Sequence, residues 1–233
     1  MSFMADQSGA VPRPAHSPSH SAENASRLSD RVRWETHAVQ ERARANGFLD
    51  ALATGRLSWV AYADLAAQNW FVYEALELAA STMSDDPTAR AFVFPELARL
   101  PSIEADLRFL HGPRWQQRIA ALPATTTYCT RLRYAANSHP VGFIAHHYAR
   151  YLGDLSGGQH LGQAIARVYG LNGDGNRFFA FPGIDLEAFE TYYRRLLDAL
   201  PWTNQEQSEF IAEVIEAYRL NIAVLDELAQ RWI

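Results

Sequence analysis

Long stretches without glycine or proline are the feature that most constrains this chain, because they leave few places for the turns that connect strands. One such stretch follows Ser58 and reaches Met83. A second opens at Ser102 and is stopped by Gly112, which precedes a proline. With 13 glycines and 11 prolines in 233 residues, a turn-rich β sandwich is disfavoured. We therefore expect an all-α fold.

Helix start and stop signals continue along the second half of the chain. Pro140 can begin a long helix that Gly170 stops. Asp185 can cap a further helix. Thr203 and Glu206 have the spacing of a capping box ahead of a last apolar stripe. These signals place helices over most of the chain beyond residue 28.

The first residues differ in composition from the rest. Residues 1–27 are rich in serine, alanine, proline and histidine and have almost no large apolar side chains, which predicts a disordered N-terminal tail. The whole chain is 48% apolar, which is enough to bury a substantial core. Because no repeat or internal linker is visible, we expect one helical domain over residues 28–233.

Charge and cysteine content narrow the class of protein. The formal net charge is −5, and Cys129 is the single cysteine. An acidic chain is a poor candidate for coating nucleic acid, and one cysteine cannot close a disulfide within the chain. No run of about 18 apolar residues or secretory signal is visible. We expect a cytoplasmic enzyme or ligand-binding protein with no nucleic-acid or membrane partner.

Three glycines lie inside the helix that Pro140 begins. Gly153, Gly157 and Gly158 each cost about 0.5–1 kcal/mol relative to alanine in a helix interior. Something local must offset that cost, such as a kink or the close approach of backbone to a flat partner. Helical spacing puts Arg150 and Asp154 on the same side. The alternative is tight helix–helix packing through small residues, with Arg150 and Asp154 as an ordinary ion pair.

The glycine-rich segment also carries a family resemblance. The nine residues 151–159, YLGDLSGGQ, resemble the signature of the haem oxygenases. The resemblance extends through GRLS at 55–58, QNWFVYEALE at 68–77, FPEL at 94–97, YYR at 192–194 and RLN at 219–221. It implies a single all-α, haem oxygenase-like domain. In that family haem lies between a proximal helix bearing a histidine ligand and a kinked, glycine-rich distal helix.

The resemblance implies an enzyme that opens haem to biliverdin and releases carbon monoxide and ferrous iron. Haem is then both substrate and prosthetic group. Dioxygen is the oxidant, and electrons come from a transient ferredoxin or flavoprotein reductase, because the sequence suggests no flavin or nicotinamide site of its own. A monomer is the default for this fold.

The resemblance also assigns roles on the distal helix. Gly153 and Gly157 let the backbone press on the haem face, and Gly158 eases the kink. Asp154 holds ordered water near the distal oxygen. Arg150 helps to fix that water network.

Further residues match the haem pocket at its edges. Tyr148 is a second candidate for fixing the distal water. Arg194 matches the arginine on the propionate side, and Glu190 stands where the family often has a lysine. Arg33 is a candidate replacement for that lysine. Asn221 matches a region of the last helix that lines or supports the pocket.

The iron ligand departs from the family pattern. His37 is the nearby candidate, and Glu41 four residues later can orient its imidazole. A gapless register, however, puts Gln40 where the histidine belongs. Because residues three apart share a helix face, a modest shift of this helix could present His37 to the iron. If Gln40 replaces the ligand, the alternative is a non-catalytic haem-binding protein of the same fold.

Two rival hypotheses belong to different classes of protein. One is a helical enzyme of the same broad architecture that acts on another ligand, such as the thiaminase-like or quinone-cofactor-forming groups. The second is a purely structural helical bundle, which the match over residues 151–159 disfavours.

Overall fold

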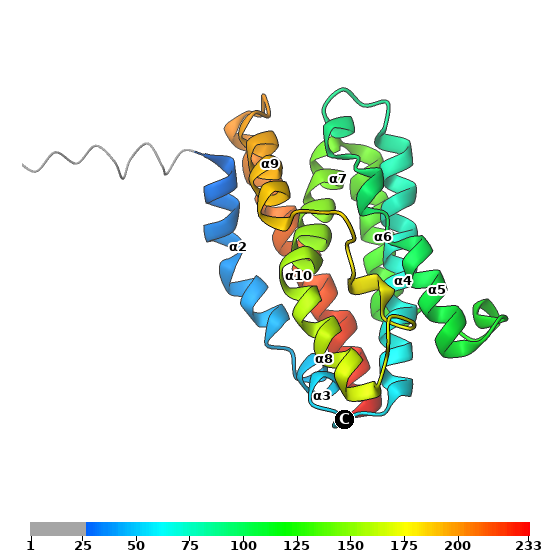
Figure 1. Ribbon diagram of the computed structural model, residues 1–233. Coiled ribbons are helices and arrows are strands. Elements are labelled where there is room, and N and C mark those ends of the chain that lie inside the picture. The colour runs from blue at the N-terminus through cyan, green and yellow to red at the C-terminus, as the bar shows by residue number, and fades with distance from the viewer. Residues whose placement is uncertain (1–26) are drawn as a thin grey trace, which may run out of the picture.

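The computed structural model describes residues 27–233, and these residues form helices and connecting segments without a strand (Figure 1). The predicted tail, residues 1–27, lies outside the described part except for Arg27, so it stays a prediction. The α-helices are α2 (Leu28–Arg44), α3 (Gly47–Ala53), α4 (Trp59–Met83), α5 (Leu100–His111), α6 (Pro123–Ser138), α7 (Pro140–His147), α8 (Gln159–Tyr169), α9 (Leu186–Asp198) and α10 (Asn204–Trp232). Short 3-10 turns are η1 (Ala89–Phe92), η2 (Pro95–Leu97), η3 (Trp115–Gln117) and η6 (Arg177–Phe179). The predicted all-α fold is confirmed.

The predicted caps in the second half of the chain are present. The Asp185 side chain accepts a hydrogen bond from the backbone N–H of Ala188 at the start of α9. Thr203 and Glu206 form a reciprocal capping box ahead of α10. Gly170 follows α8 with φ +66°, a left-handed conformation that glycine adopts without strain. These local signals therefore set the helix ends as expected.

One predicted start is displaced. Helix α5 begins at Leu100 rather than at Ser102, because Pro101 occupies its first turn, where a missing N–H costs nothing. Ser58 does precede α4, but its side chain makes no capping hydrogen bond.

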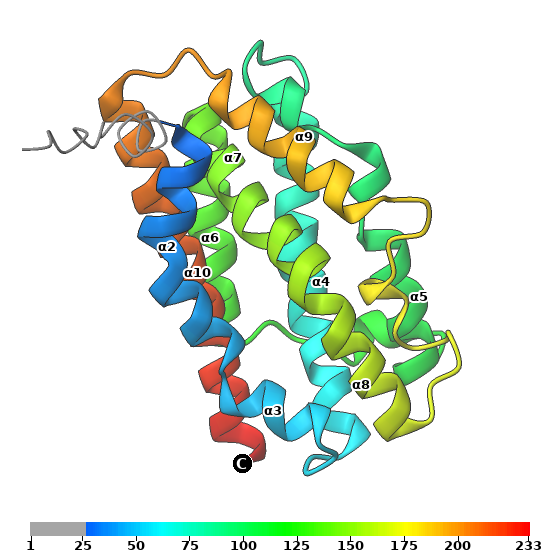
Figure 2. The same ribbon diagram turned by 60° about the vertical axis from the view of Figure 1, so that its left-hand side comes forward.

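Helix α4 lies at the centre of the molecule. Its buried positions run almost consecutively over 61–63 and 65–68, so it is covered on most sides. It contacts α5, α6 and α7, while α10 contacts α2, α6 and α7 (Figures 1 and 2). The buried apolar residues form one core cluster. No helix within residues 27–233 has the length and apolar character of a membrane span.

The long helix predicted from Pro140 is a continuous helical run with a change of winding inside it. Two segments between α7 and α8, η4 (Tyr148–Leu152) and η5 (Asp154–Gly158), have π-helical hydrogen bonding, with Gly153 between them. Such wide turns bend a helix and often occur at functional sites. The run crosses the face of the molecule obliquely opposite α2 (Figure 2).

Candidate functional site

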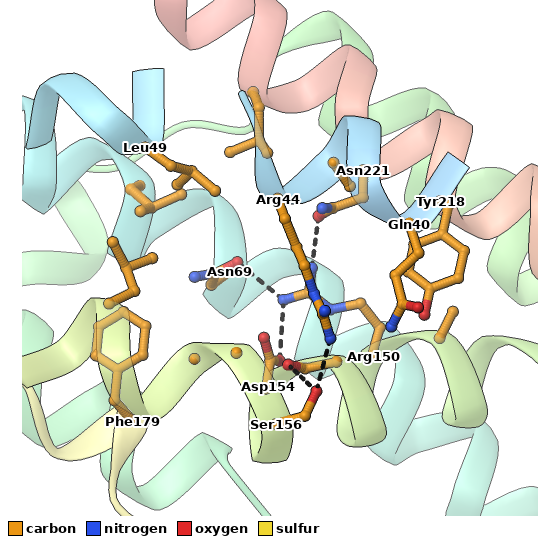
Figure 3. Close-up of a pocket in the computed structure, with 18 of the residues that line it drawn as sticks. Gln40, Arg44, Leu49, Asn69, Arg150, Asp154, Ser156, Phe179, Tyr218 and Asn221 are labelled. Atoms are coloured by element: carbon orange, nitrogen blue, oxygen red, sulfur yellow. Dashed lines mark hydrogen bonds and ion pairs between the residues drawn. The ribbon is translucent and has the colours of Figure 1, made fainter. Parts of the chain in front are cut away.

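A cavity of about 620 Å³ lies between α2 and α3 on one side and the run η4–η5–α8 on the other. Helix α10 contributes a third wall through Tyr218 and Asn221 (Figure 3). This volume is within the range of sites that hold a drug-sized or cofactor-sized molecule. Of the predicted site residues, the lining includes Gln40, Arg150, Gly153, Asp154, Gly157, Gly158 and Asn221.

Two of the predicted glycines present bare backbone to this cavity. A Cβ atom added to Gly153 would meet nothing within 4 Å, and one added to Gly157 would meet only Arg44 Nε, at 3.8 Å. At Gly158 the added Cβ would lie 3.5 Å from Asp154 Cβ and 3.6 Å from Phe179 Cδ1. Gly153 and Gly157 thus leave space in front of the helix rather than allowing another helix to approach.

Other glycines of the same run do serve packing. A Cβ atom on Gly162 would lie 2.4 Å from Phe179 Cβ, and one on Gly142 would lie 2.4 Å from the carbonyl oxygen of Ala135. Packing through small residues therefore applies to Gly142 and Gly162. It does not explain Gly153 or Gly157, which are consistent with a flat ligand.

Asp154 is held from two sides at the edge of the cavity. The hydroxyl group of Tyr73, on α4, donates a short hydrogen bond to Asp154 Oδ2. Arg150 Nη2 lies 3.4 Å from the same oxygen. Burial and the Asp154 carboxylate raise the pKa of Tyr73 well above its usual value, so its hydroxyl group remains a donor. The carboxylate is thereby fixed in orientation.

Arg150 connects three elements around the cavity. Its Nη1 donates to Asn221 Oδ1 at 2.5 Å, and its Nη2 donates to Asn69 Oδ1 at 3.1 Å. Burial alone would lower the pKa of Arg150, but the neighbouring Asp154 carboxylate and Tyr73 outweigh it and raise the pKa. The guanidinium therefore remains a cation beside the Asp154 carboxylate.

Two buried polar atoms among the lining residues have no protein partner. They are Arg150 Nε and the hydroxyl oxygen of Tyr128. Buried polar groups are nearly always hydrogen-bonded, so such atoms in a cavity wall indicate places for water or a ligand. Burial raises the pKa of Tyr128, which keeps its hydroxyl group protonated.

Helix α2 presents glutamine and arginine to the cavity, not histidine. Its buried stripe runs through Leu28, Val32 and Thr36 at four-residue spacing, and Gln40 and Arg44 continue that spacing into the lining. This burial fixes the rotation of α2.

The same rotation leaves the predicted iron ligand outside the cavity. His37 is one position beyond the buried stripe, is exposed, and does not line the cavity. Glu41, its predicted orienting partner, is also outside the lining and instead lies 3.3 Å from Arg44 Nη1. The shift of helix that would bring His37 inward is not present.

Arg44 crosses the cavity (Figure 3). Its Nη2 donates to Ser156 Oγ, on η5, at 3.2 Å. Its Nε also faces the backbone at Gly157. The guanidinium therefore lies against the glycine-rich wall.

The residues predicted for the carboxylate side of haem lie outside the cavity lining. Tyr148 is half-buried, and burial raises its pKa to about 12 while Arg194 and Arg33 act to lower it. Arg33 and Arg194 are thus cations that act on the Tyr148 hydroxyl group, and we term these three residues the rim. Glu190 Oε2 lies 3.3 Å from Arg194 Nη2, so the carboxylate partly neutralises that cation. None of these four residues lines the cavity.

The remaining histidines are mostly structural. His146 and His147 are buried, with His146 Nε2 3.0 Å from Glu213 and His147 Nδ1 3.0 Å from the Tyr193 hydroxyl group. Burial lowers the pKa of His147 to about 3, which keeps its ring neutral. His160 is exposed, and it contributes to the cavity lining beyond Gly157.

Sequence reasoning missed several residues that complete the site. Asn69 and Tyr73 belong to a stretch that resembles the family, and their four-residue spacing, which places them on one helix face, was the signal that could have identified them. Ser156 lies within the resembling stretch 151–159 but was not singled out. Tyr128 and Arg44 gave no signal, because each belongs to the site only through contacts between distant segments.

Comparison with known proteins agrees with this geometry. The Heme oxygenase family model matches residues 26–227. A heme oxygenase from Takifugu rubripes is 36% identical over 204 residues, covering 86% of this chain and 74% of the relative. Heme oxygenase 1 from Synechocystis is 33% identical over 202 residues, covering 86% of this chain and 84% of the relative. The crystal structure of heme oxygenase-1 from Synechocystis in complex with heme has a TM-score of 0.83 and 32% identity, covering 88% of this chain and 93% of that one.

The fold and site define an all-helical protein in which a bent, glycine-faced helix lines a cavity. The matches extend over most of the chain, and the two relatives are 36% and 33% identical to it. The chain belongs to the Heme oxygenase family.

Proposed function

We propose that this cavity is the haem site of a haem oxygenase, an enzyme that converts haem to biliverdin, carbon monoxide and ferrous iron. One observation carries the proposal above all: Gly153 and Gly157 leave open space before a wall that also holds Asp154 and Arg150. Family membership supports the same reaction. The relative from Synechocystis whose structure matches is itself a complex with heme.

The residues present fit the macrocycle on the glycine side. Two glycines without Cβ atoms form a smooth surface, and the unpartnered Arg150 Nε and Tyr128 hydroxyl group lie in the same lining. On the α2 side the lining residues are Gln40, Ala43 and Arg44, a donor set without an imidazole. The cavity therefore suits a flat macrocycle on its glycine side, and the predicted His37 ligand does not line it.

Bound haem supplies the iron that activates dioxygen and the porphyrin carbon that is oxidised. The chain positions the groups around it. Tyr73 and Arg150 both contact Asp154 Oδ2, which leaves Oδ1 free of protein partners in the described part of the chain. Asp154 can therefore hold a water molecule at the glycine face. A proton is then delivered through that water from a fixed position. Asn69 and Asn221 keep Arg150 in place.

The proposal includes a role for the rim. Arg33 and Arg194, together with Tyr148, form a partly cationic edge that suits the two carboxylates of haem. Glu190 competes for Arg194, so Arg33 carries a larger share of this charge pairing.

The proposal also includes a transient ferredoxin or flavoprotein reductase as electron donor, a monomeric protein and a cytoplasmic location. The reductase follows from the absence of any sequence signal for a flavin or nicotinamide site. A chain with Cys129 as its single cysteine suits a reducing compartment.

The test is a turnover assay. Hemin is added to the purified chain, followed by ascorbate or a reductase system in air, and absorbance is recorded. We expect a Soret band on binding, then its loss with the appearance of biliverdin absorption and released carbon monoxide. Hemin binding without biliverdin formation would identify a haem carrier and contradict the proposed activity.

A further inference from the structure

The α2 wall of the cavity differs in chemistry from what the proposed reaction leads one to expect. Gln40 and Arg44 continue the buried stripe of α2 into the lining, so their place follows from how the helix packs. An amide is a neutral, weak metal ligand, and a guanidinium is a cation that does not bind metal. This wall therefore offers no strong nitrogen donor to an iron centre.

His37 lies on the exposed surface of α2, outside the cavity lining. It follows Arg33 by four residues, so the two side chains are neighbours on one helix face. Arg33 acts on Tyr148 at the rim. To enter the cavity, His37 would need a rotation of α2 that would expose Val32 and Thr36, which are at most 1% exposed. Burial of those two side chains opposes that rotation.

His160 is the histidine that reaches the cavity lining among residues 27–233. It lies on α8, the wall opposite α2, and its side chain is exposed. His146 is hydrogen-bonded to Glu213, and His147 is hydrogen-bonded to the Tyr193 hydroxyl group. An imidazole on the α2 side is thus missing from the described structure.

The remaining recognition elements do not depend on a metal. The bare backbone at Gly153 and Gly157 suits a flat face, and Arg33 and Arg194, outside the lining, are cations suited to carboxylates. The Arg44 guanidinium lies against the same glycine wall, so a ligand must displace it; once moved aside, this planar cation can stack on an aromatic macrocycle. A porphyrin has the same flat face and the same two carboxylates whether or not it holds iron.

We infer that this cavity holds tetrapyrroles by shape and charge rather than by an iron–imidazole bond, and therefore also binds metal-free porphyrin. The ligand class is a planar tetrapyrrole carrying two carboxylates. Gln40 is the residue that determines this lack of metal preference. The inference rests on the proposed haem site and states what that site recognises.

The experiment compares the affinities of hemin and metal-free protoporphyrin IX, each titrated into the full chain and followed by quenching of tryptophan fluorescence and by absorbance. We expect the two dissociation constants to agree within about threefold. His37→Ala should leave both unchanged, and His160→Ala, in the cavity lining, should change both by the same factor. Gln40→His should introduce a preference for hemin of about tenfold or more, with the spectrum of histidine-bound ferric haem.

Each contrary outcome overturns the inference in a distinguishable way. A preference for hemin of about tenfold or more in the unaltered chain, lost in His37→Ala or His160→Ala, would show that histidine to be the ligand and leave the proposed function intact. The same preference surviving both substitutions would show that another side chain binds the iron, and would equally refute it. Failure of both compounds to bind would overturn the haem site itself together with this inference.

Discussion

Arg44 on α2 and Ser156 on η5 are joined across the cavity by a hydrogen bond of 3.2 Å between Nη2 and Oγ. This contact spans the two walls between which a flat ligand would lie (Figure 3). A macrocycle resting on Gly157 must displace the guanidinium, because Arg44 Nε lies close to where that glycine faces the cavity. The bond thus acts as a barrier to entry.

Replacing Arg44 with alanine should therefore speed hemin association. A net hydrogen bond of about 1 kcal/mol corresponds to an increase of about fivefold in the association rate constant. Stopped-flow absorbance at the Soret band measures this rate. Arg42→Ala is the matched control, since Arg42 is exposed on the same helix and outside the lining. An unchanged or slower rate in Arg44→Ala would contradict the barrier.

Alanine at the two cavity glycines should move stability and binding in opposite directions. At Gly153 and Gly157 the new Cβ has space in the ligand-free protein, so replacement should raise the free energy of unfolding by about 0.5–1 kcal/mol. The same methyl groups would intrude on a macrocycle and weaken hemin binding by about tenfold, as overpacking does. Urea unfolding and Soret titration measure the two effects.

Gly162→Ala is the contrasting variant. Its Cβ would lie 2.4 Å from Phe179 Cβ, so it should lower the free energy of unfolding by about 1–3 kcal/mol. If Gly153→Ala and Gly157→Ala were destabilising in the same way, those glycines would be packing positions and not a ligand surface.

Asp154→Asn should separate turnover from binding. Removing the carboxylate that Tyr73 and Arg150 orient takes away the proton-delivering group but little contact area. We expect the hemin dissociation constant to stay within about threefold, while biliverdin formation slows about a hundredfold. Asp85→Asn, at an exposed position on a turn, should leave both unchanged. Full activity of Asp154→Asn would remove Asp154 from the mechanism.

The ionisation of Glu213 should make the free energy of unfolding depend on pH in the acid range. Burial alone would raise its pKa, but hydrogen bonds from His146 and Arg131, each 3.0 Å away, lower it to about 2 from the ordinary value of 4.5. Because the folded-state pKa is the lower one, the stabilisation is complete above about pH 4.5 and is lost as the pH falls through about 2.

The destabilisation caused by Glu213→Gln should therefore be about 2 kcal/mol smaller at pH 3 than at pH 6. Urea unfolding at the two pH values measures it. Glu216→Gln, a more exposed position on α10, serves as the control. Equal destabilisation at both values would show that the Glu213 charge contributes nothing.

The helices and the glycine face were predictable because their signals are local. Gly170, Asp185 and Thr203 act within one turn of their own helix, so spacing alone identifies them. The free-energy cost of glycine at 153 and 157 is likewise local, because it arises from placing glycine inside a helix.

The rest of the site depends on how distant helices meet. Tyr73 and Asp154 are 81 positions apart, and no sequence pattern brings them into contact. The choice between His37 and Gln40 depended on the rotation of α2, which the burial of Thr36 fixes. The π-helical winding of η4 and η5 was also not predicted, beyond a kink at the glycines.

We propose that haem lies between α2 and the wall formed by Gly153 and Gly157. A crystal structure of the hemin complex would locate the macrocycle. We expect it flat against those glycines, with Arg44 moved away from Ser156 and the carboxylates towards Arg33 and Arg194. Hemin bound elsewhere on the molecule, with the contact between Arg44 and Ser156 intact, would contradict it.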